Sequence, residues 1–309
     1  MEYGSDHQNE NPRVEKTIIH QSLTVFYRDK AGSTVRLADP GQPLHAPPLA
    51  GSGLPVILIH GFAEDGTIWD QQVVSLKKDY RLIVPDLPGS GRSSPLPGDI
   101  TVEQLAGSIK AILDAESIRQ CIMIGHSMGA YIILAFAEKY PERLKAIGLF
   151  HSTAYSDTGE KKAARRKGIE FIRKNGAAPF IRQSIPNLFS ETSRKENPGL
   201  ITGLTDRYAN LDPDSLIQYY EAMIKRPDRT SVLANFAGPV LFIMGRHDNA
   251  VPFEQSLRQS HLPALSHIHI LENAGHVGML EDSAGSNQAL HGFLQFVIQY
   301  AQLTIHHSL

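Results

Sequence analysis

Six short runs of apolar residues recur along this chain, separated by longer stretches with helical periodicity. The runs are "LPVILIHG" (54–61), "YRLIVPD" (80–86), "CIMIG" (121–125), "LKAIGLF" (144–150), "PVLFIMG" (239–245) and "SHIHIL" (266–271). Strands buried on both faces of a parallel sheet have this near-continuous apolar character. Between them, "TIWDQQVVSLKK", "TVEQLAGSIKAILDAE" and "MGAYIILAFAEKY" place apolar residues at helical spacing. The alternation predicts an α/β fold with a mostly parallel central β-sheet and helices on both faces.

Two segments interrupt the alternation. Residues 39–55 are rich in Pro and Gly, which predicts a loop between an N-terminal strand or hairpin, "SLTVFYRD", and the first parallel strand. Residues 156–235 contain no strand-like run, only polar-rich helical stretches punctuated by prolines, and this pattern predicts an inserted helical cap, or lid. We therefore expect a core over 21–155 and 236–309, and a flexible polar tail over residues 1–20.

Composition excludes several classes of function. The 30 Lys and Arg residues nearly balance the 32 Asp and Glu residues, so no global field attracts nucleic acid or an anionic membrane. The basic run "KKAARRKG" (161–168) lacks interleaved aromatic residues, and we interpret it as a solvated helix face. We expect no nucleic-acid partner, and the sequence leaves the oligomeric state open.

One stretch has the length of a membrane span, because residues 120–137 include no Asp, Glu, Lys or Arg. Gly125, His126, Ser127 and Gly129 break it into a β-prone half and a helix-prone half, which predicts a buried strand turning into a buried helix. The polar N-terminus has no basic-then-apolar pattern of a secretory signal. We expect no membrane association and a cytoplasmic location.

The turn between these halves, "GHSMG" at 125–129, holds a serine in the setting that nucleophilic catalysis requires. A G-x-S-x-G turn between strand and helix exposes its serine in a strained conformation, and a Cβ at either flanking glycine would crowd the turn. Ser127 would lie at a helix N-terminus, where the dipole favours developing negative charge. The alternative is a serine that only caps the helix.

Four motifs together resemble the α/β-hydrolase fold family, and its capped esterases, lactonases and carbon–carbon bond hydrolases above all. They are "HGF" (60–62), "GHSMG" (125–129), "GRHDNAVP" (245–252) and "NAGHVGMLED" (273–282). The resemblance implies Ser127 as nucleophile, Asp248 as orienting acid and His276 as general base, in the family's chain order. It also implies an oxyanion hole made by the backbone N–H groups of Phe62 and Met128. It implies no cofactor, and no cysteine–histidine cluster has zinc spacing.

Other readings of these residues stay open. Asp248 could only form a turn in "RHDN", and His60 and His126 are expected to brace the loops by hydrogen bonds. Asp157 lies too far beyond the preceding strand to serve as the acid. Glu64 and Asp65, which follow "HGF", could grip a substrate amine in a peptidase, but we interpret them as solvated loop residues.

The residues predict a serine hydrolase that cleaves a small-molecule ester or lactone through an acyl-enzyme on Ser127. The same triad would also support hydrolytic carbon–carbon cleavage or cofactor-free peracid formation, since fold and triad do not determine the reaction. A receptor that keeps the site to hold a small ligand is a further alternative. Serine at position 127 excludes branches of the family that need a carboxylate nucleophile.

Overall fold

The computed structural model describes residues 14–21, 23–30 and 54–306. Their strands form one eight-stranded sheet in the order β1-β2-β4-β3-β5-β6-β7-β8. The strands are β1 (Val14–His20), β2 (Leu23–Lys30), β3 (Val56–Ile59), β4 (Leu82–Pro85), β5 (Cys121–His126), β6 (Leu144–Phe150), β7 (Val240–Gly245) and β8 (Ser266–Leu271). β1 and β2 run antiparallel to their neighbours, and every other pairing is parallel, so the sheet is mostly parallel as predicted.

Helices cover both faces of this sheet because side chains alternate along each buried strand. Ile57 and Ile59 belong to a core cluster with α2 (Val102–Ala115) and α3 (Met128–Lys139). Val56 and Leu58 point to the other face, toward α1 (Asp70–Leu76) and α12 (Ser283–His306). α2 begins with the predicted capping box of Thr101 and Gln104. The strand and helix periods read from the sequence therefore describe the layers correctly.

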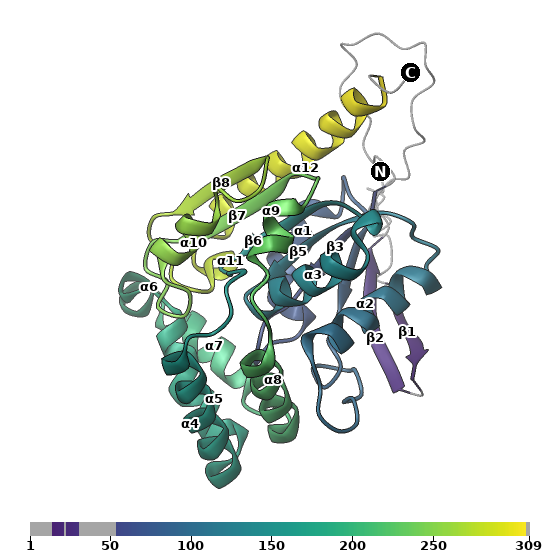
Figure 1. The fold of residues 1–309 in the computed structure, drawn as a ribbon. Coiled ribbons are helices and arrows are strands. Elements are labelled where there is room, and N and C mark those ends of the chain that lie inside the picture. The colour runs from purple at the N-terminus through teal and green to yellow at the C-terminus, as the bar shows by residue number, and fades with distance from the viewer. Residues whose placement is uncertain (1–13, 22, 31–53, 307–309) are drawn as a thin grey trace, which may run out of the picture.

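Every element between β6 and β7 is a helix. These elements are α4 (Gly159–Asn175), α5 (Ala177–Ser184), the 3₁₀ turn Ile185–Leu188, α6 (Glu191–Glu196), α7 (Pro198–Tyr208), α8 (Pro213–Lys225) and α9 (Thr230–Asn235). Figure 1 shows α4, α5, α7 and α8 gathered on one side of the core, at the bottom of the view. That this insertion acts as a lid stays a prediction.

The expected tail over residues 1–20 is wrong for residues 14–20, which form β1 and pair with β2. Lys16 holds the strand in place, since its Nζ lies 2.8 Å from Asp29 Oδ2 and 2.9 Å from Glu116 Oε1. β1 was not predicted because it is an edge strand, and the side chains of its sequence "VEKTIIH" are exposed or half-buried. Residues 1–13, and the part of the predicted loop up to residue 53, lie outside the described residues.

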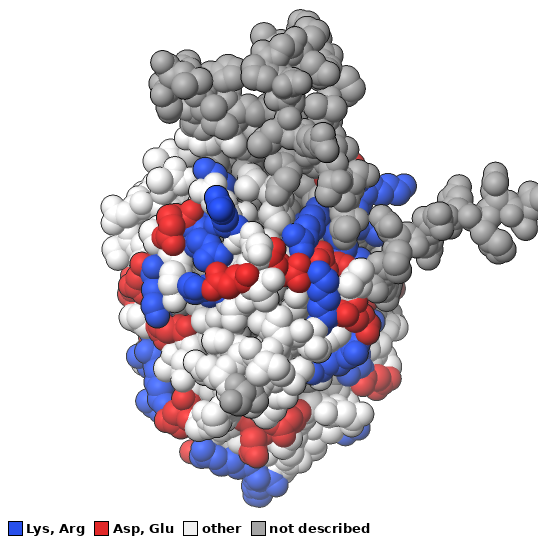
Figure 2. All heavy atoms as spheres, turned by 90° about the vertical axis from the view of Figure 1, so that its right-hand side faces the viewer, with Lys and Arg blue, Asp and Glu red and all other residues white. Residues whose placement is uncertain are grey.

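The segment of membrane-span length is β5 followed by α3, as predicted. Over 14–21, 23–30 and 54–306, no helix is long and apolar enough to cross a membrane. On the face shown in Figure 2, Lys and Arg are interspersed with Asp and Glu rather than gathered by sign. The remaining short elements are the 3₁₀ turns Gly66–Trp69 and Pro141–Arg143, with α10 (Phe253–Gln259) and α11 (Gly278–Glu281).

Candidate active site

The turn between β5 and α3 holds Ser127 in a backbone conformation that L-residues rarely adopt. Its φ is 49° and its ψ is −113°. Such strain persists only where the surroundings enforce it. Here a Cβ on Gly125 would lie 2.5 Å from the backbone N of Ala130, and one on Gly129 would lie 2.4 Å from the carbonyl oxygen of Ile59. Only glycine permits these approaches, so the two flanking glycines are a steric requirement of the turn.

Backbone hydrogen bonds hold Ser127 and leave its hydroxyl available. Its N–H donates to the Phe150 carbonyl at 2.9 Å, and its own carbonyl accepts from the Ser152 hydroxyl at 2.7 Å. The Ser127 side chain makes no capping hydrogen bond to α3. The alternative of a serine that merely caps the helix is therefore wrong.

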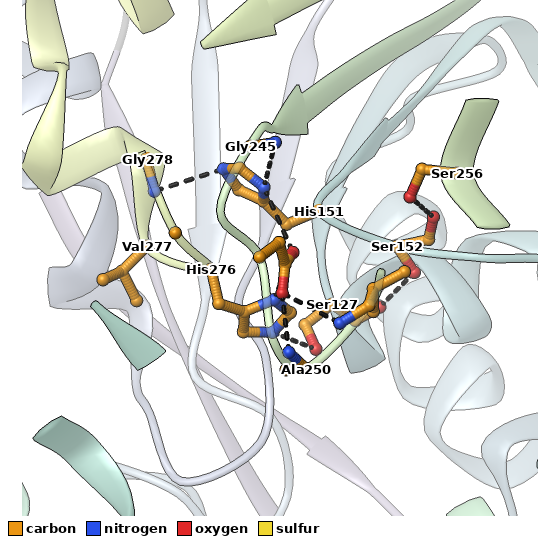
Figure 3. Close-up of polar contacts among 12 residues, drawn as sticks. Ser127, His151, Ser152, Gly245, Ala250, Ser256, His276, Val277 and Gly278 are labelled. Atoms are coloured by element: carbon orange, nitrogen blue, oxygen red, sulfur yellow. Dashed lines mark hydrogen bonds and ion pairs between the residues drawn. The ribbon is translucent and has the colours of Figure 1, made fainter. Parts of the chain in front are cut away.

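The structure brings Ser127, His276 and Asp248 into one hydrogen-bonded line (Figure 3). His276 Nε2 lies 2.9 Å from Ser127 Oγ, and His276 Nδ1 lies 2.8 Å from Asp248 Oδ2. Because a carboxylate only accepts, Nδ1–H donates to Asp248 and Nε2 accepts from the serine hydroxyl. His276 follows β8 and Asp248 follows β7, so both loops lie at the carboxyl ends of parallel strands. This is the arrangement that activates a serine.

Asp248 is held as an anion. Burial by itself would raise its pKa, but the neighbouring His276 and His151 outweigh burial and hold that pKa far below its usual range. Its second oxygen, Oδ1, accepts from the backbone N–H groups of Ala250 and Val251, each at 2.8 Å. Asp248 thus forms the turn in "RHDN" and also orients His276, so both roles considered for this residue are compatible.

The two amides predicted for an oxyanion hole come from neighbouring loops. Met128 is the first residue of α3, and Phe62 follows β3. Among the described residues, neither backbone N–H donates a hydrogen bond. Amides without intramolecular partners at a helix start are suited to bind an anion.

A buried pair beneath His276 was missed in the sequence. His126 Nδ1 lies 2.9 Å from Glu64 Oε2, and His126 Nε2 lies 2.8 Å from the His276 carbonyl oxygen. Both partners are acceptors, so both ring nitrogens carry protons and His126 is an imidazolium. Burial opposes charge on both groups, but their mutual attraction prevails, raising the pKa of His126 and lowering that of Glu64.

Glu64 is therefore not a solvated loop residue as predicted, because it is buried and ion-paired. It also accepts from the Gly61 N–H at 2.7 Å, which ties the loop of Phe62 to the loop of His276 through His126. The expected bracing role of His126 is confirmed. His60 braces likewise, since its Nε2 accepts from the Leu87 N–H at 2.9 Å.

A second histidine contacts the acid. His151, directly after β6, is fully buried and has a φ of 50°. Its Nδ1 lies 3.0 Å from the Gly245 nitrogen and 3.4 Å from Asp248 Oδ2, and its Nε2 lies 3.2 Å from the Gly278 nitrogen. In one tautomer Nδ1–H donates to Asp248 and Nε2 accepts from Gly278; in the other Nδ1 accepts from Gly245. His151 thereby connects the loops that carry Asp248 and His276 (Figure 3).

Asp157, excluded as the acid by its position, pairs elsewhere. Its buried carboxylate lies 2.6 Å from Arg165 Nε and 2.9 Å from Arg226 Nη1. Cys121 is buried, as its apolar run predicts, and burial raises the pKa of its thiol to about 12. Within the part of the chain that the structure describes, no group of three His, Cys, Asp or Glu side chains could hold a metal ion.

Comparison with known proteins agrees with this fold. A family model described as the alpha/beta hydrolase fold matches residues 55–283, and the chain belongs to that family. It is a hydrolase of this fold.

Two relatives and one solved structure show the range of the similarity. Lipase 1 of Psychrobacter immobilis is 25% identical over 89% of this chain and 89% of that protein. A 2-hydroxy-6-oxo-2,4-heptadienoate hydrolase of Pseudomonas putida is 24% identical over 79% of this chain and 90% of its own. A malate-bound thermophilic esterase from Thermogutta terrifontis is 28% identical, with a TM-score of 0.80, over 93% of this chain and 99% of that one.

Replacing Glu64 tests the buried pair. We expect Glu64→Gln to lower the free energy of unfolding by about 3 kcal/mol near pH 6, the cost of leaving a buried charge without its partner. Folding raises the pKa of His126 above 6.5, so the pair's contribution is full below that pH and is lost as the pH rises through the folded value. Urea denaturation at pH 6 and pH 9 should therefore show a smaller difference from wild type at pH 9. Exposed Glu196→Gln is the control, and a pH-independent difference would contradict the ion pair.

Replacing His151 tests its connecting role. In His151→Phe the ring keeps its shape but accepts no hydrogen bond, so either the Gly278 or the Gly245 N–H, depending on the tautomer of His151, loses its acceptor. We expect the free energy of unfolding to fall by about 1–3 kcal/mol, the cost of one buried donor left without a partner. Urea denaturation measures this change, and hydrogen exchange should become faster at Gly245 or Gly278. Unchanged exchange at both amides would show that His151 does not hold these loops.

Proposed function

We propose that this chain is a serine hydrolase that cleaves a small-molecule ester or lactone through an acyl-enzyme on Ser127. The observation that carries the proposal is the hydrogen-bonded line from Ser127 Oγ through His276 to Asp248, with distances of 2.9 and 2.8 Å. The family assignment and the similarity to an esterase and a lipase support it.

In the first half-reaction, Ser127 Oγ attacks the substrate's carbonyl carbon while its proton passes to His276 Nε2. The carbonyl oxygen becomes an oxyanion, for which the N–H groups of Phe62 and Met128 are the proposed donors. The tetrahedral intermediate then collapses, the bond to the leaving oxygen breaks, and His276 returns the proton to that oxygen. Asp248 stays ionised throughout and stabilises the imidazolium, as its lowered pKa requires.

In the second half-reaction, water replaces the serine hydroxyl as nucleophile. His276 takes a proton from the water, which attacks the acyl carbon, and then gives the proton to Ser127 Oγ as the acid is released. The buried His126–Glu64 pair helps this step by holding the backbone of His276 in place. The strained turn keeps Ser127 Oγ at the same point in both half-reactions.

Replacing the nucleophile tests this function. We expect Ser127→Ala to remain folded and to lose ester turnover by on the order of 10⁶-fold, as loss of a triad serine does elsewhere. A fluorophosphonate should label wild type and not this variant, with exposed Ser231→Ala as a control that keeps both properties. The measurement is turnover of p-nitrophenyl esters and lactones, with a vinylogous diketone as the carbon–carbon substrate. Full turnover in Ser127→Ala would refute the nucleophile. Labelling without turnover of any substrate would favour a receptor, and preference for the diketone would favour carbon–carbon cleavage.

A further inference from the structure

The basic run 161–168 does not form a uniformly solvated helix face, as the sequence suggested. In α4, Arg166 and Lys167 are exposed, but Lys161 and Arg165 are partly buried. They share one face of the helix with Gly168, where a Cβ would lie 2.7 Å from the Tyr220 ring. An inward helix face is normally apolar, so two cations there need an explanation.

Lys161 lies against the loop that carries Asp248. Its Nζ donates to the Ala250 carbonyl at 2.9 Å, while the Ala250 N–H donates to Asp248 Oδ1 at 2.8 Å. Among the described residues, no carboxylate lies within ion-pair distance of Lys161. An ammonium has three donors, so two remain for another acceptor.

Arg165, one turn further along α4, reaches toward the proposed oxyanion loop. Its guanidinium lies 5.5 Å from the Tyr220 ring centroid, and that ring stacks on Phe62 with centroids 4.2 Å apart. The inward face of α4 therefore extends from the loop of Asp248 at Lys161 to the aromatic pair that includes Phe62. These two loops supply the acid and one proposed oxyanion donor; the α4 face contacts the first through Lys161 and approaches the second through Tyr220.

Three cations act on the Tyr131 side chain. Arg226 joins Lys161 and Arg165, with its guanidinium 3.8 Å above the ring of Tyr131, which lies one helical turn after Ser127. Burial would raise the pKa of Tyr131, but these three cations outweigh burial and lower it. Asp157 is the buried carboxylate that pairs with both arginines.

Two further carboxylates lie near these cations. Asp228 is exposed and accepts from the Ser156 N–H near Arg226. Asp248, held as an anion, lies on the loop that Lys161 binds, but it does not pair with Lys161 directly. Of the three cations, Lys161 is the one that has no described carboxylate within ion-pair distance.

We propose that Lys161, supported by Arg165, binds a carboxylate carried by the substrate, so that the substrate class is an ester or lactone with a second, anionic end. The inference rests on the proposed function and adds the substrate's charge to it. A Lys ammonium that uses one donor on the Ala250 carbonyl has two donors left, which can bind one or both oxygens of a carboxylate.

The test compares two substrates that differ in one charge: the p-nitrophenyl monoester of adipic acid and its methyl p-nitrophenyl diester. We expect wild type to prefer the monoanion, mainly through KM. Lys161→Met should lower kcat/KM for the monoanion by about fivefold, the most that one partly exposed ion pair contributes, and change the diester less than about twofold. Exposed Arg166→Met on the same helix should change neither substrate. Added salt should reduce turnover of the monoanion only.

Equal losses on both substrates in Lys161→Met would overturn the inference while leaving the proposed function intact. If wild type turned over neither substrate, the proposed function would fail and binding would decide the inference separately. Calorimetry on Ser127→Ala should then show that the monomethyl adipate anion binds, and that adding Lys161→Met weakens the binding by about fivefold. No binding to Ser127→Ala would refute the carboxylate site, and equally tight binding of inorganic phosphate would show a general anion site instead.

Discussion

The close approach of α3 to the end of β3 is the contact on which the candidate site depends. Gly129 lies so near the carbonyl oxygens of Ile59 and His60 that no side chain fits between them. This approach places the first amide of α3 beside the loop that begins at Gly61. The strained φ of Ser127 follows from the same packing, because the chain must leave β5 and start the helix within one residue. One steric contact therefore explains two features: the strained backbone of Ser127, and the closeness of the two candidate oxyanion donors.

Around this turn, buried charges hold loops that no secondary structure joins. Glu64 binds the Gly61 amide and His126, and His126 binds the carbonyl of His276. On the other side, His151 connects the end of β7 to Gly278 and contacts Asp248. Buried ion pairs often contribute little net stability compared with apolar packing. Here these contacts contribute through their direction, because each hydrogen bond determines where a histidine ring lies in the site.

The predictable part of this protein is the part encoded by local pattern. Continuous apolar runs identified six parallel strands, and the glycine spacing around Ser127 identified the strained turn, because both signals lie within a few neighbouring residues. Asp248 and His276 were found through motifs with characteristic positions after strands. Glu64 and His151 gave no such signal, since their partners lie 62 residues away in His126 and 94 residues away in Gly245. Sequence shows that a charged residue exists, but only the fold shows whether it is buried and what it faces.

The same limit applies to α4, and it bears on how substrate and insertion interact. In a run of basic residues, helical geometry alone divides Lys161 and Arg165 from Arg166, and composition cannot show which face turns inward. Asp157 pairs with Arg165 of α4 and with Arg226 at the end of α8, and Arg226 also donates to the Tyr155 carbonyl, so this network joins the insertion to the core. A carboxylate bound at Lys161 would give this ammonium a direct anionic partner, which no described carboxylate supplies. A ligand stabilises whichever arrangement it binds best. An anionic substrate bound at Lys161 would therefore stabilise the packing of α4 against the loop that carries Asp248.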